Sequence, residues 1–124
     1  MIRIHFNREE STITIVSKGA VSYKEMLEAP NILTREDIPN NIKILEDASE
    51  AEPVFSDDKI PEIVQNLITK SSHLSYVKHA VIQRTPINTA ISMMAERELR
   101  ESHYHLKTFF SKDAALRWLN SEEI

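Results

Sequence analysis

The sequence of 124 residues predicts one α/β domain, a mixed, mostly parallel five-stranded sheet with helices packed on it. Strand-like stretches alternate with helix-like segments in the order strand–strand–helix–strand–helix–strand–helix–strand–helix. Only a short polar link separates the first two strands, which predicts an antiparallel hairpin. Helices separate the later strands, which predicts parallel neighbours joined by right-handed crossovers.

The amino-terminal part predicts a hairpin followed by a capped helix. Apolar and polar residues alternate over residues 2–6, as in a half-buried strand, and residues 12–17 are rich in β-branched side chains. Gly19 comes after this second strand, where we expect a backbone with positive φ. Ser22 and Glu25 have the spacing of a capping box, which predicts a helix start.

The middle of the chain predicts a connection, a strand and an amphipathic helix. Pro30 limits the first helix to about two turns. Residues 31–41 are expected to form the connection to the third strand, with one helical turn that begins at Thr34. Residues 42–47 predict the third strand. Ser56, Asp57 and Asp58 then offer N-caps to the second helix. Apolar residues follow at the spacing of one helix face, namely Ile60, Ile63, Val64, Leu67 and Ile68.

The carboxyl-terminal part predicts two strands and two helices. Residues 77–83 form a strand with an uninterrupted apolar centre, which is typical of a buried parallel strand. Thr85 and Pro86 fit the N-cap and first position of the next helix. Residues 104–110 predict the fifth strand, and Ser111 caps the last helix. The long helix after Pro86 is expected to bury Ile87, Ala90, Ile91, Met94 and Ala95.

The composition excludes several kinds of site. Gly19 is the only glycine, whereas average usage is about 7%, and P-loops and dinucleotide fingerprints need two or three glycines. The absence of cysteine excludes a disulfide framework, a thiolate nucleophile and an iron–sulfur cluster. No pairing of a nucleophile with a base is visible in the sequence. We therefore expect neither a cofactor nor an enzyme.

The net charge and hydropathy of the chain limit the kinds of partner that we expect. With 15 basic and 19 acidic residues the net charge is −4, which argues against a protein that binds the nucleic-acid backbone. No segment approaches about 18 uncharged apolar residues, so no transmembrane segment is expected. The first residues are charged and lack the apolar region of a signal peptide, which predicts a cytoplasmic location.

Three stretches carry a resemblance to a known family. They are residues 42–47 (Ile-Lys-Ile-Leu-Glu-Asp), residues 78–82 (Lys-His-Ala-Val-Ile) with Pro86 after them, and residues 109–119 (Phe-Phe-Ser-Lys-Asp-Ala-Ala-Leu-Arg-Trp-Leu). In these the chain resembles the STAS domain family, within it the stand-alone bacterial SpoIIAA-like branch of Bacteroidetes type. The resemblance implies a non-enzymatic module for bacterial signalling that acts through protein–protein interaction or small-ligand sensing. We expect a protein partner or a homodimer, for which the first strand offers a free sheet edge.

One loop departs from the family pattern. Anti-sigma factor antagonists carry an Asp-Ser-Ser-Gly-type stretch whose serine is phosphorylated to switch partner binding. In the matching stretch here Asp58 replaces that serine and Lys59 replaces the glycine, while Ser56 lies two residues away. A carboxylate does not form a stable phosphate ester, so we expect no serine phospho-switch. Asp57 and Asp58 either cap the helix start or form a permanently acidic surface for a partner.

Polar residues gather where the predicted parallel strands end. Ligands of open α/β sheets bind outside these carboxyl ends, which here present Lys18, Asp47, Arg84, Thr85 and Ser111. If Asp47 and Arg84 converge, they form a polar crevice able to hold an anion or a polar head group. The alternative is that these residues cap helices or pair with one another.

An apolar pocket is the second functional expectation. The branch is similar in fold to the lipid-binding CRAL-TRIO domains, which implies a binding protein for an apolar or amphipathic small molecule. Methionines and aromatic residues are the expected lining, namely Met26, Phe55, Met93 and Met94. His103 and His105 share a strand face but are too few for a zinc site. The isolated histidines His5, His73 and His79 are expected to have no special role.

Overall fold

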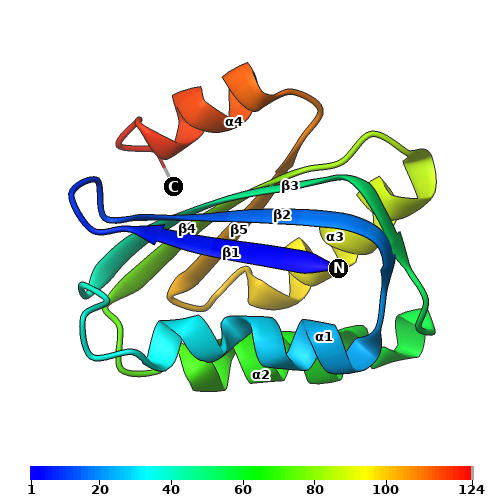
Figure 1. Cartoon of the computed structure of the whole chain (residues 1–124), viewed down its shortest axis with the longest axis horizontal. Coiled ribbons are helices and arrows are strands. Elements are labelled where there is room, and N and C mark those ends of the chain that lie inside the picture. Colours follow the sequence, from blue (N-terminus) through cyan, green and yellow to red (C-terminus); the bar gives the residue numbers. More distant parts are fainter. Residues whose placement is uncertain (124) are drawn as a thin grey trace.

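The computed structural model describes residues 1–123 and shows a five-stranded sheet between two layers of helices (Figure 1). The strands lie in the order β1-β2-β3-β4-β5. The first pair is antiparallel and every later pair is parallel, which confirms the predicted fold class. The strands are β1 (Ile2–Asn7), β2 (Thr12–Val21), β3 (Asn41–Pro53), β4 (Tyr76–Ile82) and β5 (Tyr104–Phe109).

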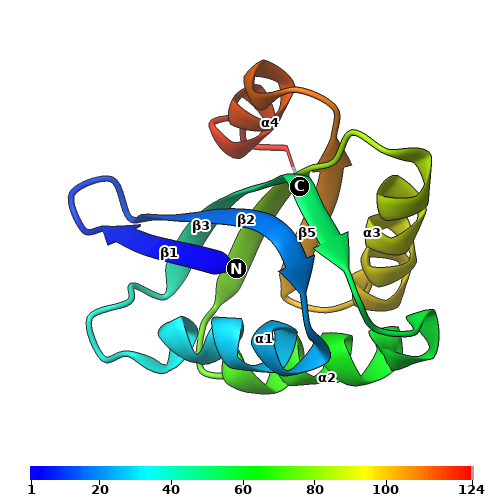
Figure 2. The same ribbon diagram turned by 45° about the vertical axis from the view of Figure 1, so that its right-hand side comes forward.

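The helices divide unequally between the two faces of the sheet (Figure 2). Three helices cover one side, which we call the three-helix face, and one helix covers part of the other, which we call the α4 face. The α-helices are α1 (Tyr23–Glu28), α2 (Ile60–Lys70), α3 (Pro86–Leu99) and α4 (Lys112–Leu119), and the short 3-10 helices are η1 (Ala29–Thr34) and η2 (Asp57–Lys59). No helix in residues 1–123 is long and apolar enough to span a membrane.

The sheet separates a large core from a small one. The large core fills the three-helix face, and the small core lies between the sheet and α4, around Ala80, Ile82 and Trp118. Successive side chains of β4 point alternately into the two cores, so that Val77 and Val81 face the large one. Burial on both faces explains the uninterrupted apolar run that predicts this strand.

The predicted helix starts are confirmed at three of four helices. The Ser22 hydroxyl accepts a hydrogen bond from the backbone N–H of Glu25, whose carboxylate accepts one from the N–H of Ser22, which completes the capping box. Thr85 and Ser111 cap α3 and α4 in the predicted way. The caps predicted at Ser56, Asp57 and Asp58 are wrong, because η2 intervenes and Lys59 is the N-cap residue of α2. The side chain of Ser56 makes no capping hydrogen bond.

Strands β2 and β3 continue beyond their predicted ends. Residues 18–21 of β2 pair with residues 50–53 of β3, after a register shift between Val16 and Lys18. Gly19 lies inside this extension and has φ +66°, so the positive φ is confirmed although the residue belongs to the strand. The predicted helical turn that begins at Thr34 is wrong, since η1 ends there.

The orientation of α3 differs from the prediction. Its expected apolar stripe points partly to solvent, with Ile87 74% exposed and Met94 42% exposed, while Ser92 and Leu99 are the buried residues. Polar contacts explain the difference. The side chain of Asn88 donates to the carbonyl of Ala51 at 2.9 Å, and Ser92 accepts a hydrogen bond from the sheet, which holds this side of the helix against the strands.

Candidate ligand-binding site

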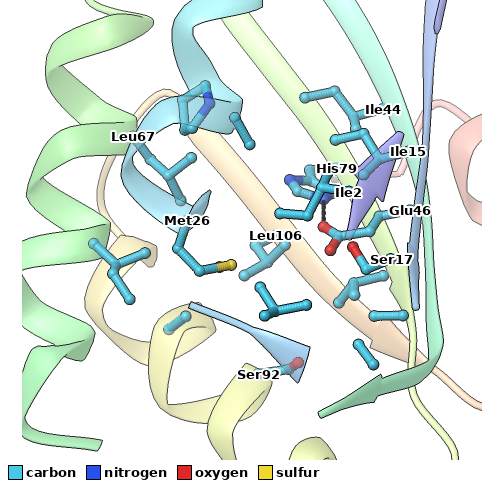
Figure 3. A pocket seen from close by; sticks show the side chains of 18 of the residues that line it. Ile2, Ile15, Ser17, Met26, Ile44, Glu46, Leu67, His79, Ser92 and Leu106 are labelled. Carbon is cyan, nitrogen blue, oxygen red and sulfur yellow. Dashed lines mark hydrogen bonds and ion pairs between the residues drawn. The ribbon is translucent and has the colours of Figure 1, made fainter. Parts of the chain in front are cut away.

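An apolar cavity of about 130 Å³ lies between the three-helix face of the sheet and the helices that cover it (Figure 3). Met26 enters it from α1 and Leu67 from α2, opposite Ile44 and Leu106 of the sheet. An engineered cavity of about 150 Å³ holds benzene, so this one has room for one aromatic ring or a short alkyl chain. Well-packed interiors leave few voids larger than a water molecule, which makes this cavity the leading candidate for a site.

Contacts between α1 and α2 fix the helical wall of the cavity. The Tyr23 hydroxyl donates to the carboxylate of Glu62, and the Asn66 amide donates to the carbonyl of Leu27 at 2.9 Å. The ammonium group of Lys59 lies 5.4 Å from the centroid of the Tyr23 ring. These polar contacts join the two helices that carry Met26 and Leu67, so the wall is held by more than apolar packing.

Three adjacent strands contribute a hydrogen-bonded chain to the sheet side of the cavity. Nε2 of His79 on β4 lies 2.7 Å from a carboxylate oxygen of Glu46 on β3, and its Nδ1 lies 2.6 Å from the hydroxyl of Tyr104 on β5. Figure 3 shows the first of these contacts on the cavity wall. All three side chains line the cavity. The chain therefore places a carboxylate, an imidazole and a phenol inside an otherwise apolar wall.

The hydrogen bonds that join Tyr104, His79 and Glu46 run in one donor-to-acceptor direction. Full burial raises the pKa of Tyr104 well above its usual value, and the nearby charge of Glu46 raises it further, so the phenol remains protonated. Nδ1 of His79 is the only hydrogen-bond partner of this hydroxyl within residues 1–123. Donation to Nδ1 leaves no buried O–H unpaired, so we assign Tyr104 as the donor. A neutral imidazole then carries its proton on Nε2 and donates it to Glu46. Glu46 is thus the acceptor at the end of the chain.

Further polar atoms of the cavity wall have free hydrogen-bonding capacity. The Nε2 of Gln83 donates to Ser92 at 3.0 Å, while its Oε1 is buried and has no partner among the described residues. Glu46 binds His79 through Oε1 alone, and within residues 1–123 no lysine or arginine forms an ion pair with it. Ser17, also buried, lines the same part of the wall. Figure 3 shows Ser17 beside Glu46.

The sheet register brings these polar groups together. Glu46 is paired with Val81 of β4. His79 lies two residues before Val81 on the same strand face, and Gln83 lies two residues after it, just beyond the end of β4. Ser17 approaches from β2. The polar groups therefore form one patch on the cavity wall, and the apolar helices face it.

Asp47 and Arg84 lie outside this cavity. Asp47 follows Glu46 and therefore points to the opposite face of β3, inside the strand and not at its end as predicted. Its carboxylate accepts hydrogen bonds from the hydroxyl of Ser49 at 2.6 Å and from the N–H of that residue at 3.0 Å. These bonds lower the pKa of Asp47, and the positive charges of Arg84 and Lys18 lower it further. The three charges thus interact without forming an ion pair within 4.0 Å.

The other predicted site residues are spread over the surface. Thr85 caps α3 by accepting a hydrogen bond from the backbone N–H of Asn88 at 3.2 Å. Ser56, Asp57 and Asp58 are exposed around η2 and do not join Arg84 or Asp47 in one site with shared contacts. The structure therefore does not assemble the predicted binding residues into a single site.

The predicted cavity lining is half right. Met26 and Phe55 line the cavity, whereas Met93 and Met94 are exposed on the outer side of α3. The interpretation of His79 as a residue without a special role is wrong, since it holds the centre of the polar chain.

The sequence does contain a signal for the polar chain. Glu46 has the same strand parity as Ile42 and Ile44, and His79 has the parity of Val77 and Val81. A charged or titratable residue at an inward position of a strand is unusual and indicates a buried polar group.

Comparison with solved structures supports the fold. A crystal structure of an uncharacterized protein of the DUF3478 family from Shewanella loihica PV-4, described as having a SpoIIAA-like fold, superposes with a TM-score of 0.63. It shares 17% sequence identity over 95% of this chain and 93% of that one. The chain has a SpoIIAA-like fold. No family model matches the sequence, and no curated protein shows significant similarity to it.

Proposed function

We propose that this SpoIIAA-like protein binds a small apolar or amphipathic molecule in the cavity between the sheet and its three helices. The observation that carries the proposal is the cavity itself, apolar in its walls with a small polar patch on one side. A molecule bound there would remove its apolar surface from water, which stabilises the complex.

The test uses two alanines of α3 as a matched pair. Ala95 lines the cavity, whereas Ala90 is exposed five residues earlier on the same helix. Ala95→Leu fills the cavity, and Ala90→Leu adds the same side chain outside it. We expect toluene to raise the melting temperature of the native protein and of Ala90→Leu but not of Ala95→Leu. Equal shifts in the two variants would place binding elsewhere, and no shift in any of the three would refute the proposal.

The second candidate is the interaction module implied by the sequence resemblance. The exposed apolar side chains of α3, in particular Ile87 and Met93, support it, because such residues often mark a contact surface. In this alternative a protein partner or a second copy covers the outer side of α3. Ile87→Asp with Met93→Lys would then abolish the contact, and an unchanged mass in sedimentation and pull-down measurements for native and variant protein alike would count against it. We favour ligand binding over the interaction module, because the cavity lies directly between α3 and the sheet.

A further inference from the structure

The polar patch of the cavity offers acceptors in excess of donors. The carboxylate of Glu46 has one oxygen bound to His79 and the other without a hydrogen-bond partner within residues 1–123. Its side chain is only 18% exposed, so water screens its charge poorly. Since the Nδ1 of His79 accepts a hydrogen bond from Tyr104, the imidazole is in its neutral form and does not neutralise that charge. A carboxylate in an apolar wall is favourable only when a cation or several donors compensate it.

Gln83 provides an independent indication. Its side chain is more than nine-tenths buried, with 8% exposed, and its amide N–H₂ already donates to Ser92. The amide oxygen is left buried without a partner in the described part of the chain, although buried carbonyl oxygens are almost always hydrogen-bonded. Gln83 lines the same cavity as Glu46, so a ligand that carries an N–H group there would bring a donor to this side chain.

The two acceptors belong to neighbouring parts of the cavity wall. Val81 pairs with Glu46 across the strands, and Gln83 lies two residues beyond Val81, directly after the end of β4. The hydroxyl of Ser17 adds a third polar atom beside Glu46. An ammonium group carries three N–H donors and a positive charge, which matches this set of acceptors. An anionic head group would instead be repelled by the negative charge of Glu46.

We propose that the ligand is an amphipathic amine whose protonated head binds Glu46 and Gln83 while its apolar body, of the size of one aromatic ring, fills the cavity beside Met26 and Leu67. This inference rests on the proposed function and adds the chemical class of the ligand. It also excludes fatty acids, whose carboxylate head has the wrong charge.

Four probes of similar size test the head group. Toluene, benzyl alcohol, benzylamine and benzoate share one ring and differ in the polar end, and their dissociation constants are measured by titration calorimetry near neutral pH. We expect benzylamine to bind at least about tenfold more tightly than toluene, benzyl alcohol to fall between them, and benzoate to bind most weakly. If toluene binds as tightly as benzylamine, or benzoate binds best, the inference is wrong while the cavity remains a binding site. If none of the probes binds, the proposed function fails as well.

A pair of neighbouring charge-removing variants provides the control. Glu46→Gln keeps an oxygen for His79 but removes the charge, and Asp47→Asn makes the same change on the opposite face of β3. We expect Glu46→Gln to weaken benzylamine about tenfold or more and to leave toluene unchanged, and Asp47→Asn to alter neither. Retained toluene binding shows that the variant is folded. Unchanged benzylamine binding in Glu46→Gln would overturn the inference, and should that variant not fold, the probe series on the native protein decides alone.

Discussion

Tyr104 and Glu46 together determine how His79 is protonated, because each of them binds one ring nitrogen. The phenol is buried and keeps its proton, which leaves Nδ1 as an acceptor and places the imidazole proton on Nε2. At this scale the site is a set of hydrogen bonds with a defined direction that ends on a carboxylate. The free oxygen of that carboxylate is what a ligand would meet.

The tautomer of His79 is a direct prediction. We expect the neutral imidazole to be the Nε2–H tautomer, as seen in the nitrogen chemical shifts of the ring. Tyr104→Phe leaves Nδ1 buried without a donor and should cost about 1–3 kcal/mol in the free energy of unfolding, measured in urea. Observation of the Nδ1–H form in the native protein would contradict the assigned direction.

The lowered pKa of Asp47 predicts a pH-dependent contribution to stability. A carboxylate whose folded pKa lies below the ordinary value of 3.8 stabilises the fold above that value and loses this effect as the pH falls through the folded pKa. We expect Asp47→Asn to be less stable than the native protein near neutral pH, with the difference shrinking below pH 3.8. A stability difference that stays constant from neutral pH down through the acid range would show that the Ser49 bonds and the nearby cations do not act on this carboxylate.

At the scale of elements, α4 is attached through a buried lysine. Lys78 of β4 is fully buried, and its ammonium group donates to the carbonyls of Trp118 at 2.5 Å and of Ser121 at 2.9 Å. It also lies 4.7 Å from the centroid of the Trp118 ring. Because these carbonyls end α4, the lysine acts as a cap supplied by the sheet. Burial lowers the pKa of Lys78, but the three acceptors around the ammonium compensate part of that cost.

Replacement of this lysine should loosen α4 selectively. We expect Lys78→Met to lower the free energy of unfolding by about 1.5–3 kcal/mol, the usual value for hydrogen bonds to a charged group. Amide hydrogen exchange should become faster in α4 and in Trp118 while the three-helix face stays protected. Lys70→Met, which changes a half-buried lysine at the end of α2 whose charge does not act on Lys78, is the control. Faster exchange throughout the sheet would indicate that the lysine holds more than α4.

The helices also show how an element can be predicted while its orientation is not. The sequence predicts α3 with its cap and nearly its full length, yet it places Ile87 and Met94 on the buried side. Asn88 and Ser92 decide otherwise, because their partners are Ala51 of β3 and Gln83, which directly follows β4, and both lie outside the helix. A periodic pattern within one helix contains no information about such partners.

At the scale of the whole molecule, the unequal covering of the sheet creates the site. Three helices span the three-helix face and leave a cavity between them and the strands, whereas α4 covers a small core on the other face. The polar patch of the cavity lies on its strand side among apolar residues, and the helices face it mainly with apolar side chains. A molecule with one polar end and one apolar end fits this division.

A measurement on the intact protein follows from this division. Native mass spectrometry of protein isolated from its own host should reveal, besides the chain, a bound small molecule that Ala95→Leu protein does not retain. The same spectrum reports whether the chain is a monomer or a dimer. If the native protein, like the variant, shows only the mass of its own chain, the expectation of a retained natural ligand is wrong.

The sequence by itself determined the order of the elements, three of the four helix caps and the class of the sheet. Capping, strand alternation and helical spacing depend on residues close along the chain. The helix caps at Ser22, Thr85 and Ser111 can therefore be predicted without a structure. The tertiary structure alone decided the extension of β3 past Asp47 and the assembly of Glu46, His79 and Tyr104. Both depend on the register between strands far apart in the chain. For that reason the sequence indicated the kinds of side chain available, and only the paired strands showed which of them meet around the cavity.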